Sequence, residues 1–138
     1  MDRDEFVRLL NEDLQTEYQW IVQYIQHLSS IKGVEYQAVL PALRTHLGQE
    51  LEHALTLAAQ IDFLGGVPAV GVPPIIAETN AKRALELDLE LETKQLLRYR
   101  ERVNEANDLS RVDVAEALRP LLEQTQDHVR DLQGALGL

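Results

Sequence analysis

The chain is short, acidic and poor in aromatic residues. It has 138 residues, 45% of them hydrophobic, so it can form one domain with an apolar core but not two ordinary domains. It contains no cysteine, which excludes disulfides, thiolate zinc sites and iron–sulfur clusters. The net charge of −10 argues against nucleic acid or an anionic membrane as a partner. Without an apolar run near ~20 residues or a basic leader, we expect a cytoplasmic protein.

The first half of the chain predicts two amphipathic helices. Apolar residues recur there at steps of three and four, which is the helical period. The first helix is expected from about residue 4 to residue 31, with Asp2 and Glu5 forming a start that resembles a capping box. The second is expected to begin or bend near Pro41 and to end at Leu64, before a pair of glycines.

The middle of the chain predicts an extended crossover. Residues 65–78 contain glycines and three prolines, and about fourteen residues at ~3.3 Å each span more than 40 Å, roughly the length of a helix in this chain. A third helix is expected from Thr79 or Asn80. A fourth follows Ser110, which with Asp113 resembles a capping box. Because the other two joints are short, we predict an all-α antiparallel four-helix bundle over residues 1–138 with one long crossover between helices 2 and 3, the ferritin-like topology.

The two halves of the chain repeat one pattern. The same shift along the sequence that aligns Leu10 with Leu85 aligns all the matching pairs. The other matching pairs include Leu14 with Leu89, Glu17 with Glu92, Tyr24 with Tyr99, Leu43 with Leu118, and His53 with His128. One pair breaks the pattern, because Glu50 corresponds to Thr125. The chain is therefore predicted to contain two copies of one helical hairpin, each with a carboxylate, a tyrosine and a histidine in its apolar seam.

The spacing predicts that the polar seam residues meet at one depth of the bundle. Glu17 and Glu50 lie at equal distances from the turn at Gly33, and Glu92 and Thr125 lie at equal distances from the second turn. The separation along the chain is the same in both pairs, so these four positions should converge midway along the helices.

Two histidines complete the predicted polar layer. His53 and His128 each follow position 50 or 125 by three residues, on the same helical face. Carboxylates buried without a counter-charge cost several kcal/mol each, whereas a bound cation removes that cost. Carboxylate and imidazole ligands suit iron, manganese or zinc. The alternative is a tilted seam that leaves the glutamates solvated at its edge, and the repetition of the whole set favours the metal site.

Several segments resemble those of a known family. Residues 10–24 resemble the first helix of bacterioferritin-like di-iron carboxylate proteins, members of the ferritin-like superfamily. The sequence Glu-Leu-Glu-His at residues 50–53 and Phe-Leu-Gly-Gly-Val-Pro at residues 63–68 resemble the second helix and its exit loop. Leu-Glu-Leu-Glu at residues 89–92 resembles the third helix.

The resemblance implies an iron-binding protein that oxidises Fe(II) with oxygen or peroxide, as a ferroxidase-type oxidoreductase does. It implies a two-metal site in which Glu17 with His53 holds one ion, and Glu92 with His128 holds the other. Glu50 would bridge the two ions. Manganese or zinc could take the place of iron, and no catalytic residue is expected beyond the metal ligands.

Three features depart from the family pattern. Thr125 stands where the family has a second bridging glutamate, so the site could hold one metal only. Leu51 stands where the family has its haem-ligating methionine, and the only methionine is Met1, so no haem is expected. The sequence extends only to Leu138, shortly after helix 4, so we expect a small assembly, a homodimer formed through helices 1 and 2, rather than a cage. Tyr18, Trp20 and Val22 supply bulk outside the seam of helix 1 for this contact.

The remaining polar residues of the pattern have expected supporting roles. His46 is predicted to be a hydrogen-bonded core histidine, with an extra metal ligand as its alternative role. His27 is predicted to be a surface residue. Tyr24 and Tyr99 are predicted to bond to ligand carboxylates. A rival interpretation of the whole chain is a bundle with a degenerate or single-metal site that serves as a structural or interaction module.

Overall fold

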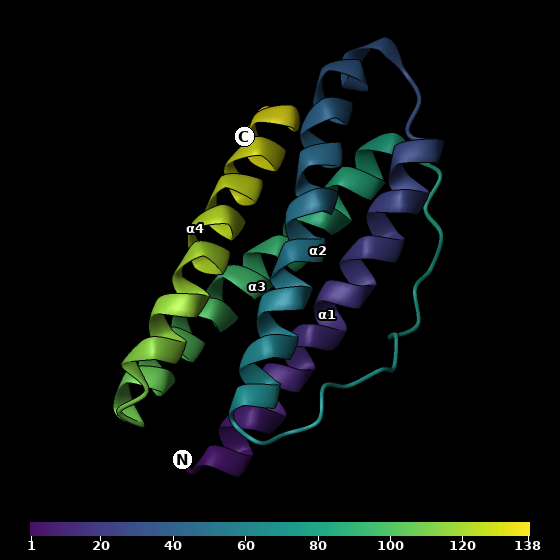
Figure 1. Cartoon of the computed structure of the whole chain (residues 1–138). Helices are drawn as coiled ribbons and strands as arrows, with labels where there is room; N and C mark the ends of the chain where they lie inside the picture. The colour runs from purple at the N-terminus through teal and green to yellow at the C-terminus, as the bar shows by residue number, and fades with distance from the viewer.

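The protein is a bundle of four long helices, described here from a computed structural model that covers residues 1–138 (Figure 1). The elements in chain order are α1 Arg3–Ser30, a short 3-10 helix η1 Val34–Val39, α2 Leu40–Phe63, α3 Ala81–Asp108 and α4 Val112–Ala135. There is no β-strand, and the predicted all-α bundle is confirmed. None of the helices is both long and apolar enough to span a membrane.

Local signals set most helix ends. The Asp2 carboxylate accepts a hydrogen bond from the Glu5 amide at 2.8 Å and caps α1, as the sequence predicts. The Asn80 side chain caps α3 in the same way through the Arg83 amide at 2.9 Å. Pro41 lies in the first turn of α2, where its missing N–H is tolerated, so it marks a start rather than a bend.

The predicted capping box at Ser110 and Asp113 is wrong. α4 begins after Arg111, which makes no side-chain cap. Ser110 has a φ of 59° and belongs instead to the end of α3, where its amide bonds to the Asn107 carbonyl. The Arg111 amide bonds to the carbonyl of Ala106, which completes a Schellman motif. Ser110 adopts the left-handed conformation that ends α3, so it cannot adopt the extended conformation that an N-cap of α4 would need.

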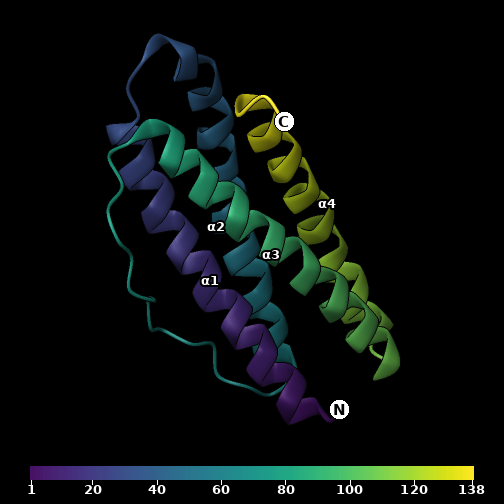
Figure 2. The same ribbon diagram turned by 180° about the vertical axis from the view of Figure 1, so that it is seen from behind.

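The crossover lies along the outside of α1 (Figures 1 and 2). Asn11 on α1 donates to the Val67 carbonyl at 3.1 Å and accepts from the Ala69 amide at 2.8 Å. Tyr18 also donates to the Ala69 carbonyl at 2.8 Å. Gln15 and Gln26 add further bonds from α1 to the crossover backbone. Polar residues on the outer face of α1 therefore hold the crossover in place.

The core consists of two apolar clusters separated by a polar layer. One cluster contains Phe6, Leu10, Leu14, Ala54, Leu57, Ile61, Leu64, Tyr99, Val103, Ala106, Val114, Ala115, Leu118 and Leu121. The other contains Trp20, Tyr24, Ile31, Val39, Leu43, Ala84, Leu85 and Leu132. Trp20 is fully buried and stacks on Tyr24 with ring centroids 4.7 Å apart, so the prediction that it adds bulk to the outer face of α1 is wrong. Between the clusters, each helix contributes polar residues to the interior.

Candidate metal centre

The polar layer is formed by the side chains of six residues, each residue being no more than 1% exposed. They are Glu17 from α1, Glu50 and His53 from α2, Glu92 from α3, and Thr125 and His128 from α4. Two groups within this layer bring possible ligand atoms within 4.8 Å of one another: Glu17, Glu50 and His53, and Glu50, Glu92 and His128. The structure therefore brings together all five residues predicted as metal ligands. Their binding of metal stays a prediction.

Glu50 is the residue that the two groups share. Its Oε1 atom lies 3.8 Å from Nδ1 of His53 and 2.9 Å from Nδ1 of His128. The carboxylate thus stands between two imidazole rings whose centroids are 6.1 Å apart. This is the position expected of a group that could contact two ions at once.

Tyr99 and Tyr24 differ in their contacts. The Tyr99 hydroxyl donates a hydrogen bond to Oε1 of Glu17, as predicted for a residue that supports a ligand carboxylate. Tyr24 instead pairs with Nδ1 of His46 at 3.2 Å, so its predicted bond to a carboxylate is wrong. His46 contacts both Tyr24 and His128 of the polar layer, and its Nδ1 is the partner of the Tyr24 hydroxyl.

Burial determines the protonation of the layer. Desolvation, with the charge of Glu17 as the next cause, raises the pKa of Glu50 well above its ordinary value of 4.5. The same two causes raise the pKa of Glu92. Desolvation lowers the pKa of His128 to about 2, with smaller contributions from His46 and His53. The imidazole of His128 is therefore neutral at physiological pH and can act as a metal ligand.

Five buried polar atoms of the layer make no hydrogen bond, although Oε1 of Glu50 lies 2.9 Å from Nδ1 of His128. They are Oε2 of Glu17, both carboxylate oxygens of Glu50, Nδ1 of His53 and Oε1 of Glu92. Unpartnered buried polar atoms are rare in folded proteins, and five of the nine side-chain atoms of this kind in the chain lie in this one layer. All five are lone-pair donors of the kind that iron, manganese or zinc accepts, so the donor set fits a metal centre.

Thr125 reaches the layer but does not offer it a ligand. Its side chain is 1% exposed, as the predicted convergence requires. Its hydroxyl donates to the Leu121 carbonyl of its own helix at 2.7 Å. The fourth side of the layer therefore lacks the carboxylate that Glu50 supplies at the equivalent position of α2.

The outer nitrogens of the two candidate ligand histidines bond to glutamines that were not predicted. Nε2 of His53 lies 2.7 Å from Oε1 of Gln124, and Nε2 of His128 lies 2.6 Å from Oε1 of Gln49. The offset that carries Leu10 onto Leu85 also carries Gln49 onto Gln124, so the internal repeat contains the signal that would have found them.

His46 and His27 are both buried, each 1% exposed. His46 bonds to Tyr24 and to Asp131 and stacks on His128 with ring centroids 4.0 Å apart, so its prediction as a core histidine is confirmed. The prediction of a surface position for His27 is wrong. Its Nδ1 lies 2.9 Å from Oδ2 of Asp88, and the α1–α3 interface covers it.

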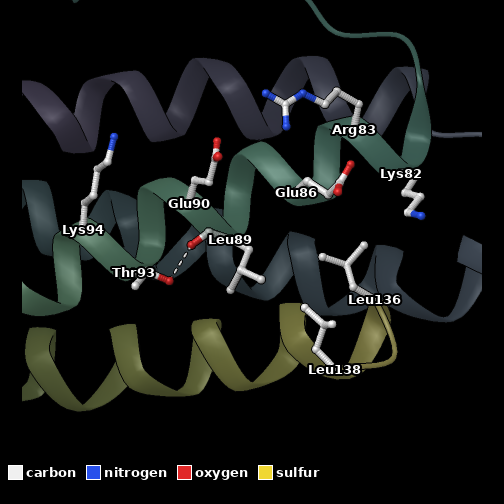
Figure 3. Close-up of a pocket in the computed structure, with 9 residues that line it drawn as sticks. All are labelled: Lys82, Arg83, Glu86, Leu89, Glu90, Thr93, Lys94, Leu136 and Leu138. Carbon is white, nitrogen blue, oxygen red and sulfur yellow. Dashed lines mark hydrogen bonds between the residues drawn. The ribbon is translucent and has the colours of Figure 1, made fainter.

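Two grooves on the surface differ in their relation to the layer. A wholly polar groove of about 460 Å³ between α2 and α4 reaches His128 and is lined by Thr45, His46, Gln49, Asp127, His128, Arg130 and Asp131. Figure 3 shows a second groove, of about 640 Å³, between α3 and the C-terminal residues Leu136 and Leu138. No candidate ligand lines this second groove, whereas the polar groove has His128 on its wall.

The comparisons with known proteins agree with this geometry. A family profile described as a ferritin-like domain matches residues 7–138. The chain therefore belongs to the ferritin-like family. No curated protein matches it in sequence.

Several solved structures resemble the chain over most of its length. One is described as a ferritin-like, diiron-carboxylate protein from Bacillus anthracis, with 27% identity, a TM-score of 0.91 and 99% of both chains covered. A bacterioferritin from Desulfovibrio desulfuricans has 18% identity and a TM-score of 0.87 over 98% of this chain and 80% of its own. A dodecameric thioferritin, the bacterioferritin-related protein of Bacteroides fragilis, has 24% identity and a TM-score of 0.85 over 99% of this chain and 87% of its own. These last two establish likeness of fold alone.

Proposed function

We propose that the chain binds two divalent metal ions, iron in the first place, in its polar layer and oxidises Fe(II) with oxygen or peroxide. The observation that carries this proposal is the pair of overlapping carboxylate–imidazole groups that share Glu50. The description of the Bacillus anthracis relative as a diiron-carboxylate protein supports it.

Each residue of the layer has a separate task in this proposal. Glu17 and His53 would hold one ion, Glu92 and His128 the other, and Glu50 would contact both. Iron, when bound there, would supply one-electron redox chemistry. The Tyr99 hydroxyl holds one oxygen of Glu17 and leaves the other free.

The surroundings control access to the layer. The apolar clusters on either side exclude bulk water from the layer. The polar groove between α2 and α4, with Gln49 and His128 on its wall, would be the approach for cations and a small oxidant.

The oxidation balances without a further reactant. Two Fe(II) substrate ions lose one electron each, one oxygen molecule gains both electrons, and two protons from solvent complete hydrogen peroxide. With peroxide as oxidant, the same two electrons and two protons cleave its O–O bond and give two water molecules.

The charge of the layer limits its hold on the second ion. Two divalent ions bring four positive charges, and Glu17, Glu50 and Glu92 return three negative charges if the histidines stay neutral. One uncompensated charge at ~4 Å matters by several kcal/mol in a bundle core. We therefore expect weaker binding of the second ion, or recruitment of a hydroxide or small anion.

A second candidate function follows from Thr125. With its hydroxyl bonded to Leu121, the site could hold one metal or none, and the bundle would then serve as a structural or interaction module. Exposed apolar side chains on α1 and α2, Val22, Ile25, Leu51 and Leu55, support the proposed homodimer contact in either case. Sedimentation analysis tests that contact, and a strict monomer or a large cage would contradict it.

A metal titration separates the two functions. The protein, purified without added iron, is titrated with Fe(II) under nitrogen and then exposed to oxygen. Binding of two ions per chain followed by rapid oxidation supports the proposed function. No bound iron, or one ion that oxidises no faster than Fe(II) in buffer, supports the structural alternative.

A further inference from the structure

We infer that Gln49 and Gln124 are positioning residues, each of which orients the ligand histidine of the other half of the chain and fixes its tautomer. The bonds cross the bundle: Gln49 on α2 holds His128 on α4 at 2.6 Å, and Gln124 on α4 holds His53 on α2 at 2.7 Å. This inference rests on the proposed metal-binding function for its purpose, but not for its geometry.

The amide oxygens decide which nitrogen of each ring carries the proton. In both bonds the glutamine atom is Oε1, which can only accept, so Nε2 of the histidine must be the donor. A neutral imidazole has one N–H, and so the Nδ1 atoms of His53 and His128 carry lone pairs. The glutamines thereby select the tautomer in which Nδ1 is free to bind a cation.

Those Nδ1 atoms are the ones that face the carboxylates. Nδ1 of His53 lies 3.6 Å from Oε1 of Glu17 and has no hydrogen-bond partner. Nδ1 of His128 lies 2.8 Å from Oε2 of Glu92 and 2.9 Å from Oε1 of Glu50. A lone pair facing carboxylate oxygens requires a proton on a carboxyl group or a cation between them, so the tautomer prepares each group for a metal ion.

The crossed pairing is not the one that local spacing would give. Gln49 and His53 are four residues apart on α2, where side chains commonly meet, and Gln124 and His128 have the same spacing on α4. Each glutamine nevertheless bonds to the histidine of the opposite helix. Each ring is therefore held by a group from the helix that faces it, which links α2 and α4 at the level of the layer.

A neutral amide performs this role differently from a carboxylate. A carboxylate beside Nε2 would also hold the proton on that nitrogen, but it would favour the imidazolium in the metal-free protein and add a negative charge beside the layer. The amide oxygen orients the ring without adding charge. The charge of the layer is then set by Glu17, Glu50 and Glu92 alone.

The tautomers can be measured directly in the metal-free protein. Two-bond proton–nitrogen NMR spectra of isotope-labelled protein identify the protonated nitrogen of each histidine. We expect Nε2–H at both His53 and His128 in the unmodified chain. Gln124→Leu should change the signals of His53 and leave those of His128, and Gln49→Leu should do the reverse.

Metal affinity gives the second readout. Zn(II), which has no redox chemistry of its own, should bind about 10- to 100-fold more weakly to each leucine variant. Gln124→Glu and Gln49→Glu keep an acceptor oxygen beside the ring and should keep the proton on Nε2. Gln126→Leu, at an exposed position of α4, is the matched control and should change neither readout.

The outcomes distinguish the inference from the proposed function. An Nδ1–H tautomer at either histidine of the unmodified protein, or Gln49→Leu acting on His53 instead of His128, would overturn the inference even if metal binds. Nε2–H tautomers in a protein that binds neither Zn(II) nor Fe(II) would uphold the positioning and contradict the function. If a leucine variant does not fold, the spectra of the unmodified protein and of the glutamate variants decide.

Discussion

Asp13 and Asp88 occupy equivalent positions in the two halves of the chain, each one helical turn before a candidate ligand glutamate and each paired across the α1–α3 interface. Oδ2 of Asp13 accepts from Nε of Arg102 at 2.8 Å, and Oδ2 of Asp88 pairs with Nδ1 of His27 at 2.9 Å. His27 and Arg102 are themselves equivalent positions of the repeat. The repeat thus extends to the buried pairs beside the layer, with a permanent cation in one pair and an imidazole in the other.

Arg102→Leu should destabilise the protein strongly. Asp13 is fully buried, and desolvation raises its pKa to about 7 even though Arg102 opposes that rise. Without Arg102, a buried carboxyl loses its counter-charge, and we expect a loss of about 3–5 kcal/mol in the free energy of unfolding. Urea denaturation at about pH 8.5, where the Asp13 carboxyl of the unmodified chain is ionised, measures this loss, with Arg100→Leu at an exposed position as the control. Equal stability of the two variants would show that the pair contributes nothing.

Glu50→Ala should abolish metal binding, because Glu50 is the residue shared by both ligand groups. Glu52→Ala is the matched control, since Glu52 lies two residues further on α2 and is exposed. Metal analysis after incubation with Fe(II) under nitrogen checks both variants. The same metal content in the two would remove Glu50 from the site.

Thr125→Glu should tighten the second metal ion and speed the oxidation of Fe(II). The added carboxylate supplies the missing charge, and one charge at ~4 Å contributes a few kcal/mol, so we expect affinity to rise about tenfold or more. Thr93→Glu is the control, because Thr93 makes the same bond to its own helix, 2.7 Å to the Leu89 carbonyl, but faces solvent (Figure 3). Unchanged stoichiometry and rate in folded Thr125→Glu would mean that position 125 does not belong to the site.

The metal-free protein should lose stability as the pH rises above 6.5. The folded-state pKa values of Glu50 and Glu92 are raised, so the folded chain holds protons that the unfolded chain releases near pH 4.5. Their contribution to stability is lost as the pH rises from there through the folded values. His128 has a pKa lowered from 6.5 to about 2, so its contribution to stability increases as the pH rises, but only below pH 6.5. Above that pH, the raised carboxyl pKa values determine how stability changes with pH.

Thermal unfolding between pH 6.5 and about 8.5 tests this dependence. Glu50→Gln should flatten the decline, because the amide does not titrate. Bound metal should also flatten it, since the ion replaces the protons. A midpoint that rises with pH in the metal-free protein would contradict the assignment of raised carboxyl pKa values.

The helical period and the internal repeat were sufficient to predict the bundle and the six residues of the layer. Steps of three and four located the seams, and equal distances from each turn placed Glu17 beside Glu50 and Glu92 beside Thr125. These inferences depend on spacing alone, which the backbone of a helix converts directly into position. They needed no knowledge of how individual side chains pair.

The errors arose where a helix buries more than one face. α1 contacts α2, α3 and the crossover, so Trp20 and His27 are buried although they lie off its seam. The sequence pattern also could not predict which side chains form hydrogen bonds with one another. Tyr24 bonds to His46 of α2 rather than to a carboxylate, and the bond of Gln49 to His128 depends on how α2 faces α4.

The crossover that lies along α1 has a consequence for folding kinetics. Its bonds to Asn11 and Tyr18 join groups that are 51 to 58 positions apart in the chain, whereas Glu17 and Glu50 in the first hairpin are closer in sequence. Closing a longer loop costs more chain entropy, so the hairpins are expected to form first and the crossover to dock late. Asn11→Ala should then accelerate unfolding and leave the refolding rate nearly unchanged in stopped-flow measurements. Slower refolding would show that the crossover docks before the rate-limiting step. If refolding is unchanged, the bonds between the crossover and α1 determine the lifetime of the folded state.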